Sequence, residues 1–180
     1  MKKVSQIGLF ICLMACSTPE PKPHLTLTPK SPEPQTAVAQ LDTTPRVTGI
    51  GGIFFSDEDD NSLERWYGHN LGLALDQYGS PFEFRNAVRP EETNYLRWDI
   101  TPTESEFYAP SNKEFMINYR VQNIEGLVRN LRASNTTILD SIVSYPYGKF
   151  VHILDPAGNK IELWEPVDRV LTALGGVTTK

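Results

Sequence analysis

The chain has 180 residues, of which 39% are apolar and 22% charged, enough for one soluble domain with a hydrophobic core. It carries 22 acidic against 17 basic side chains. This acidic balance argues against a nucleic-acid partner, because binding to a phosphate backbone needs a basic surface.

Residues 1–15 have the pattern of a signal peptide. Lys2 and Lys3 precede an apolar stretch that is too short to span a bilayer as a helix. The stretch ends in Leu-Met-Ala-Cys at 13–16, which resembles a bacterial lipoprotein signal, and this implies that Cys16 carries the lipid after cleavage. An ordinary secretory signal is the alternative. We expect a protein of the bacterial cell envelope, anchored to the membrane by its N-terminal lipid on the periplasmic side.

Residues 16–46 are rich in Pro, Thr and Ser and show no apolar period, which is typical of a disordered tether. Both cysteines, Cys12 and Cys16, precede the predicted domain. Thiolate nucleophiles, disulfides and thiolate metal sites are therefore excluded within it.

The predicted domain covers 47–166. Its first half contains a buried strand over 47–55 and a helix over 62–70, followed by three strands over 73–78, 82–86 and 95–101.

The second half repeats this order. A strand over 115–121 places Met116, Asn118 and Arg120 on one face. A helix over 124–134 follows, and then strands over 138–144, 149–154 and 160–165. The last two form a hairpin around the turn Asp-Pro-Ala-Gly-Asn. Residues 167–180 remain as a C-terminal tail.

Four stretches resemble the vicinal oxygen chelate superfamily, which comprises glyoxalases, bleomycin-resistance proteins and extradiol dioxygenases. They are GIGGIFF (49–55), WYGHNLGL (66–73), FMINYRV (115–121) and YGKFVHILDPAGNKIELWEP (147–166). The resemblance implies an α+β fold in which two βαβββ modules form an incomplete curled barrel. Helices cover its outside, and the inner face holds a ligand or a metal.

The alternation of the last strand sets the direction of Glu162. Ile161 and Leu163 share one face, which should pack on a helix, so Glu162 and Trp164 should point into the cavity. The resemblance implies that an acid at this place is a metal ligand.

The other metal ligands of the family are not matched. The resemblance puts a His at the start of each module's first strand, where this chain has Ile50 and Met116. Asp99 is the carboxylate that mirrors Glu162 in the first half. Two carboxylates fall short of the three or four protein ligands of a typical site. We therefore expect no tightly bound divalent cofactor, with a metal at Glu162 as the alternative.

The inner faces predict a site for an anionic or zwitterionic small molecule. The ligand-binding candidates are Asn118, Arg120, Phe150, Trp164 and Asp99, with Tyr95 and Arg97 beside them. His152 and Glu162 are the catalytic candidates, because a carboxylate in hydrogen-bond reach would orient the imidazole and raise its pKa for general-base chemistry. Two alternatives stay open. Arg120 pairs with Glu162 and closes the barrel, or His152 is a strand residue whose hydrogen bonds have only a structural role.

Two functions from different classes remain. One is a lipid-tethered module that binds a small, anionic molecule with a degenerate metal site. The other is a metal-dependent lyase, isomerase or dioxygenase of glyoxalase type that uses Glu162. A third possibility is a structural envelope protein whose cavity is filled by its own side chains. The sequence also leaves open whether two chains form a homodimer that shares one site.

Overall fold

The computed structural model describes residues 42–103 and 105–180. The predicted signal peptide, Cys16 and most of the predicted tether lie outside these ranges. Within them, none of the helices has the length and apolar character needed to cross a membrane.

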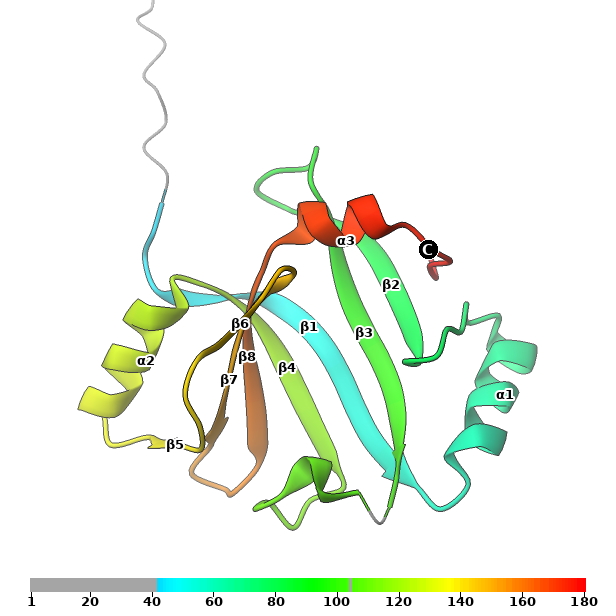
Figure 1. Cartoon of the computed structure of the whole chain (residues 1–180), viewed down its shortest axis with the longest axis horizontal. Coiled ribbons are helices and arrows are strands. Elements are labelled where there is room, and N and C mark those ends of the chain that lie inside the picture. The colour runs from blue at the N-terminus through cyan, green and yellow to red at the C-terminus, as the bar shows by residue number, and fades with distance from the viewer. Residues whose placement is uncertain (1–41, 104) are drawn as a thin grey trace, which may run out of the picture. The chain divides into compact units, whose positions relative to one another are not determined.

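The described chain forms a curled, unclosed sheet of eight strands with three α-helices (Figure 1). The path through the sheet is β2-β3-β1-β4-β8-β7-β5, and β6 pairs with β7. The elements in chain order are β1 (Arg46–Asp57), α1 (Asp60–Leu71), β2 (Ser80–Arg85), β3 (Thr93–Pro102), the short 3-10 helix η1 (Glu106–Tyr108), β4 (Phe115–Gln122), α2 (Ile124–Ala133), β5 (Thr137–Ile138), β6 (Val143–Tyr145), β7 (Gly148–Leu154), β8 (Lys160–Pro166) and α3 (Asp168–Leu174).

The two modules meet at the centre of the sheet. β1 pairs with β3 in parallel in the first module, and β4 pairs with β8 in parallel in the second. The antiparallel pairing of β1 with β4 joins the modules. This is the α+β arrangement of two half-barrels that the sequence predicts.

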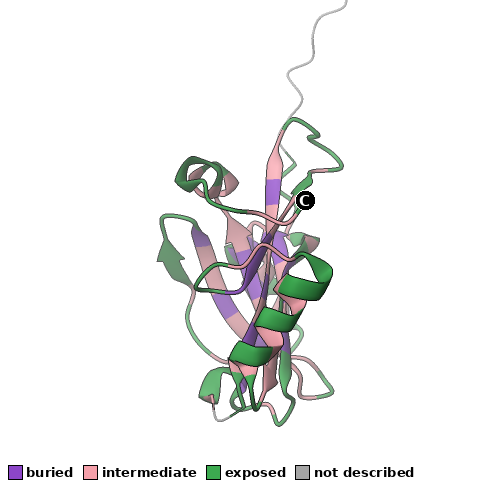
Figure 2. Ribbon diagram, turned by 90° about the vertical axis from the view of Figure 1, so that its right-hand side faces the viewer, coloured by how far each residue is buried: buried purple, intermediate pink, exposed green. Residues whose placement is uncertain are grey.

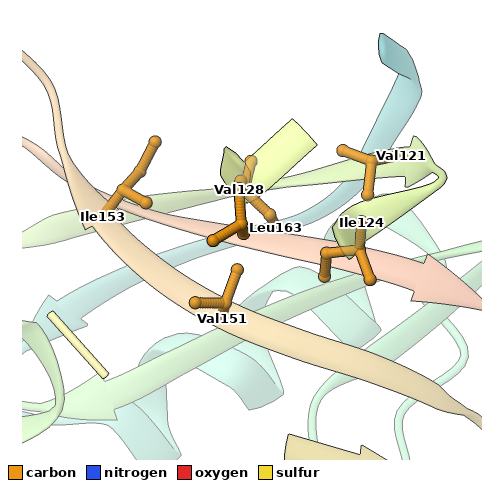
Figure 3. Close-up of a cluster of buried hydrophobic side chains, with 6 residues drawn as sticks. All are labelled: Val121, Ile124, Val128, Val151, Ile153 and Leu163. Carbon is orange, nitrogen blue, oxygen red and sulfur yellow. The ribbon is translucent and has the colours of Figure 1, made fainter. Parts of the chain in front are cut away.

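The main core lies between α2 and the outer face of the second module. It consists of Val121, Ile124, Val128, Val151, Ile153 and Leu163 (Figure 3). Full burial of such a side chain stabilises the fold by roughly 1.5–3 kcal/mol. Because Leu163 packs under the helix, its neighbours Glu162 and Trp164 face the concave side, as strand alternation requires.

The first module differs from the prediction at one strand. Residues 73–78 form no strand, and an isolated bridge between Asp76 and Gly79 takes its place. The Asp76 side chain accepts a hydrogen bond from the backbone N–H of Tyr78 at 2.7 Å, which turns the chain. The helix α1 before it presents a largely exposed outer face (Figure 2), while Tyr67 packs on Trp98 with ring centroids 4.6 Å apart.

Residues beyond 166, predicted as a tail, fold onto the first module. The helix α3 contacts β3. Further on, the backbone of Thr179 pairs with Pro81 and Glu83 of β2 at 2.8 and 3.0 Å. The C-terminal segment therefore forms part of the domain.

Candidate functional site

A cavity of about 560 Å³ lies on the concave face of the sheet. Side chains from both modules line it, together with residues 171 and 174–178 of the C-terminal segment. The sheet residues in its wall include Phe54, Tyr95, Arg97, Asn118, Phe150, Glu162 and Trp164. The cavity is therefore built from the inner faces that the sequence predicts, with the C-terminal segment as an additional wall.

Glu162 points into this cavity from β8, as predicted. Its side chain is 14% exposed. Asn118 lies directly beside it on β4, and the Asn118 amide donates a hydrogen bond to Oε2 of Glu162. On the other side, Nε2 of His152 lies 3.2 Å from Oε1. Both carboxylate oxygens are thus engaged by protein groups.

His152 lies between two carboxylates. Its Nδ1 is 2.6 Å from Oδ2 of Asp140, and Oδ1 of Asp140 accepts the backbone N–H of His152 at 2.8 Å. Burial alone lowers the pKa of His152, but the hydrogen bonds to Glu162 and Asp140 outweigh it, so the pKa is raised above 6.5. The structure therefore places His152 in reach of Glu162, and adds Asp140 as a partner.

Arg120 does not pair with Glu162. Its guanidinium forms an ion pair with Asp168 and donates to the backbone oxygen of Tyr95 at 2.9 Å. Its Cζ lies 5.1 Å from the ring centroid of Trp164. Arg120 is 4% exposed and lies outside the cavity wall. It therefore ties α3 to the sheet, and its prediction as a ligand-binding cation is not supported by this placement.

Phe150 and Trp164 form an aromatic wall. Their rings stack with centroids 5.7 Å apart and planes 9° from parallel. The indole N–H of Trp164 donates to the backbone oxygen of Tyr147 at 3.2 Å, which fixes the ring. Gly51 lies opposite, where an added Cβ would be 2.8 Å from Trp164 and 2.3 Å from Oδ1 of Asn118. The glycine therefore makes room for the inward side chains.

Asp99 shares the inner face but lies outside the wall of the cavity. Burial, followed by the nearby charge of Glu64, raises its pKa to about 6. Two residues earlier, Nη1 of Arg97 contacts both carboxylate oxygens of Asp76 at 2.7 and 2.8 Å. On this strand Arg97, rather than Asp99, reaches the cavity.

Ile50 and Met116, the residues at the predicted metal positions, are not among the residues that line the cavity. Met116 is fully buried against Phe54 and Tyr108. Asn118 is the β4 residue paired with Glu162, and Gly52 of β1 pairs with Asn118. In the first module Ile50 pairs with Tyr119 and is 37% exposed.

The donor set beside Glu162 does not fit a divalent ion. In residues 42–103 and 105–180, no three His, Cys, Asp or Glu side chains are arranged to hold a metal. Glu162 and His152 are directed at each other, and the Asn118 N–H occupies the second carboxylate oxygen.

No family model and no curated protein matches the sequence. Among solved structures, the chain is similar to the Mn(II)-bound glyoxalase from Novosphingobium aromaticivorans, with a TM-score of 0.51 and 12% identity over 76% of this chain and 42% of that chain. The described domain has the glyoxalase-like fold.

Two further solved structures are similar to the chain with TM-scores below 0.5. One is methylmalonyl-CoA epimerase from Mycobacterium tuberculosis, with a TM-score of 0.46 and 20% identity over 70% of this chain and 93% of that chain. The other is a glyoxalase/bleomycin resistance protein/dioxygenase superfamily member from Vibrio splendidus 12B01, with a TM-score of 0.41 and 18% identity over 68% of this chain and 99% of that chain.

Proposed function

We propose that this protein is an envelope-tethered domain of glyoxalase-like fold that binds a small anionic molecule with a planar apolar body, without a metal ion. The observation that carries the proposal is the cavity of about 560 Å³, walled by the Phe150–Trp164 stack and bordered by Arg97. A lipid on Cys16 and the predicted tether, shortened because residues 42–46 belong to the domain, would hold the domain at the periplasmic side of the membrane.

The aromatic wall supports a planar ligand. Ligand sites are concave and mostly apolar, with a few placed polar groups, and this cavity has that composition. The face of an aromatic side chain favours an offset-stacked or edge-on ring at a centroid distance of 4.5–7 Å. The Trp164 ring lies between Phe150 and the Arg120 guanidinium, so a phenyl-sized group would pack against Phe150 and the edge of the Trp164 ring.

The anionic group would contact Arg97. Within the described residues, the hydrogen bonds of Arg97 all leave from Nη1, so Nη2 and Nε can still donate. Charge-assisted bonds from a guanidinium to a carboxylate are about twice as strong as neutral ones. The negative charge of Glu162 is offset by its contact with His152.

Calorimetric titration of the full chain with phenylacetate tests this proposal, with 2-phenylethanol as the uncharged match. We expect Arg97→Gln to weaken phenylacetate binding about tenfold, the loss of one charged hydrogen bond, and to change 2-phenylethanol little. Arg85→Gln is the control, because Arg85 is exposed on β2 and contacts Thr93. Absence of phenylacetate binding, or equal binding by Arg97→Gln, would overturn the proposal.

A second candidate function is favoured by the His152–Glu162 contact. A carboxylate paired with an imidazole at the edge of an apolar cavity can accept a proton from a carbon acid. Phenylpyruvate is a suitable probe, since its enol forms by transfer of the benzylic proton. If the protein accelerates keto–enol exchange of phenylpyruvate and Glu162→Gln abolishes the acceleration, an isomerase-type enzyme is supported. If the protein does not change the exchange rate, the binding function is favoured.

A further inference from the structure

A second cavity, of about 270 Å³, adjoins the first. The two share Tyr147, Phe150 and Glu162 in their walls. Asp140 and Tyr145 belong to the second cavity alone. A single ligand could therefore extend past Phe150 from one cavity into the other.

The charged groups in the wall of the second cavity are two carboxylates and one histidine. Asp140 and Glu162 stand on either side of His152, so two carboxylates face one imidazole. Lys160 is the nearby cation, but its Nζ donates to the backbone oxygen of Phe107 at 2.7 Å and lies over the Phe107 ring. The charge on the wall itself thus favours a cation over an anion.

The remaining wall is aromatic. Tyr145 and Tyr147 stack with centroids 5.4 Å apart and planes 3° from parallel, and both meet Phe150 edge-on. Tyr145 is 50% exposed, so its ring is accessible to a ligand. The faces of such rings attract cations, and organic ammonium groups are commonly bound by aromatic side chains together with carboxylates.

We propose that the second cavity binds an organic ammonium group, so that the ligand carries an ammonium at Asp140 and Tyr145 and an apolar body in the first cavity. The inference rests on the proposed function only for the position of the apolar body. The ligand class is then a zwitterion, with its anionic group at Arg97 and its cationic group in the second cavity.

The test is calorimetry of the full chain at pH 8 with 2-phenylethylamine and 2-phenylethanol, which differ only in the ammonium and hydroxyl groups. The amine should bind about tenfold more tightly. In Asp140→Asn this preference should fall to within about threefold, while the Asn oxygen can still accept the backbone N–H of His152. Tyr145→Leu, at an exposed position, should also reduce it. Glu91→Gln removes an exposed acid outside both cavities and should leave the preference intact.

Equal binding of amine and alcohol by the wild type would overturn this inference. An unchanged preference in Asp140→Asn would do the same, since the ammonium would then lie elsewhere. If phenylacetate binds through Arg97 but no amine preference exists, only the second cavity fails. If the amine preference depends on Asp140 but phenylacetate does not bind, the anionic part of the proposed function fails instead.

Discussion

Arg120 on β4 and Asp168 at the start of α3 form a buried ion pair between residues 48 positions apart in the chain. Their side chains are 5% and 18% exposed. Asn94 of β3 also donates to Asp168, at 3.0 Å. The pair therefore fixes the start of the C-terminal segment, whose later residues form one wall of the cavity.

Replacement of Asp168 should destabilise the fold. In Asp168→Asn the Arg120 charge stays buried without its partner, and we expect a loss of about 3–5 kcal/mol in the free energy of unfolding. Urea denaturation measures this. The control is Glu125→Gln, which breaks an exposed pair with Lys149 and should change stability by less than about 1 kcal/mol. If both changes lower the free energy of unfolding equally, burial of the Arg120–Asp168 pair does not determine the loss of stability.

Two glycines of β1 should respond differently to alanine. In Gly51→Ala the new Cβ would lie 2.3 Å from Oδ1 of Asn118, and we expect a loss of about 1–3 kcal/mol from overpacking. In Gly49→Ala the nearest atom is Cδ of Arg120 at 3.7 Å, an ordinary contact, so stability should change little. Thermal unfolding of both variants compares them, and a neutral Gly51→Ala would contradict the described packing of the inner face.

The pH dependence of stability should report on His152. Its pKa is raised above 6.5, so its contribution is fully present below pH 6.5 and is lost as the pH rises through the folded-state value. Asp99, with its pKa raised to about 6, lowers stability as the pH rises from 3.8 through about 6, and this loss is the same in the wild type and in a His152 variant. The charged groups that face or lie near His152 are Asp140, Glu162 and Lys160.

The measurement is the free energy of unfolding at pH 6 and pH 9. The wild type should lose more stability between these values than His152→Gln does. His69→Gln, an exposed change on α1, should behave like the wild type. If His152→Gln loses as much stability between pH 6 and pH 9 as the wild type, the hydrogen bonds to Asp140 and Glu162 do not raise the pKa of the His152 imidazole.

The predicted lipid anchor gives a cellular test. After fractionation of the producing bacterium, the wild type should be found with the membranes, and Cys16→Ser should release it to the soluble fraction because the acyl chains are lost. Ser17→Ala leaves the cysteine in place and serves as the control. Recovery of the wild type in the soluble fraction would favour the ordinary secretory signal.

The sequence predicts the parts of the site that depend on strand phase. Ile161 and Leu163 alternate with Glu162 and Trp164, and this alone sets which pair faces the cavity. The hairpin turn at 155–159 fixes β7 against β8, so that His152 lies opposite Glu162. These local rules suffice for the last two strands, β7 and β8.

The remaining parts depend on contacts that local patterns do not encode. Asp140 lies in the irregular segment between β5 and β6, where a single predicted strand is broken. Asp168 belongs to a short helix of 7 residues with no buried positions, which leaves no amphipathic signal. The alternative in which Arg120 pairs with Glu162 is wrong, because Arg120 pairs with Asp168, which lies close to it only in the folded chain.

The central claim, that the cavity binds a planar anionic molecule, is tested most directly by the indole N–H signals in an NMR titration of the full chain with phenylacetate. Trp164 lines the cavity, whereas Trp66 is 51% exposed on α1. The Trp164 signal should shift and saturate while the Trp66 signal stays in place. A Trp164 signal that does not move at saturating phenylacetate would contradict the account.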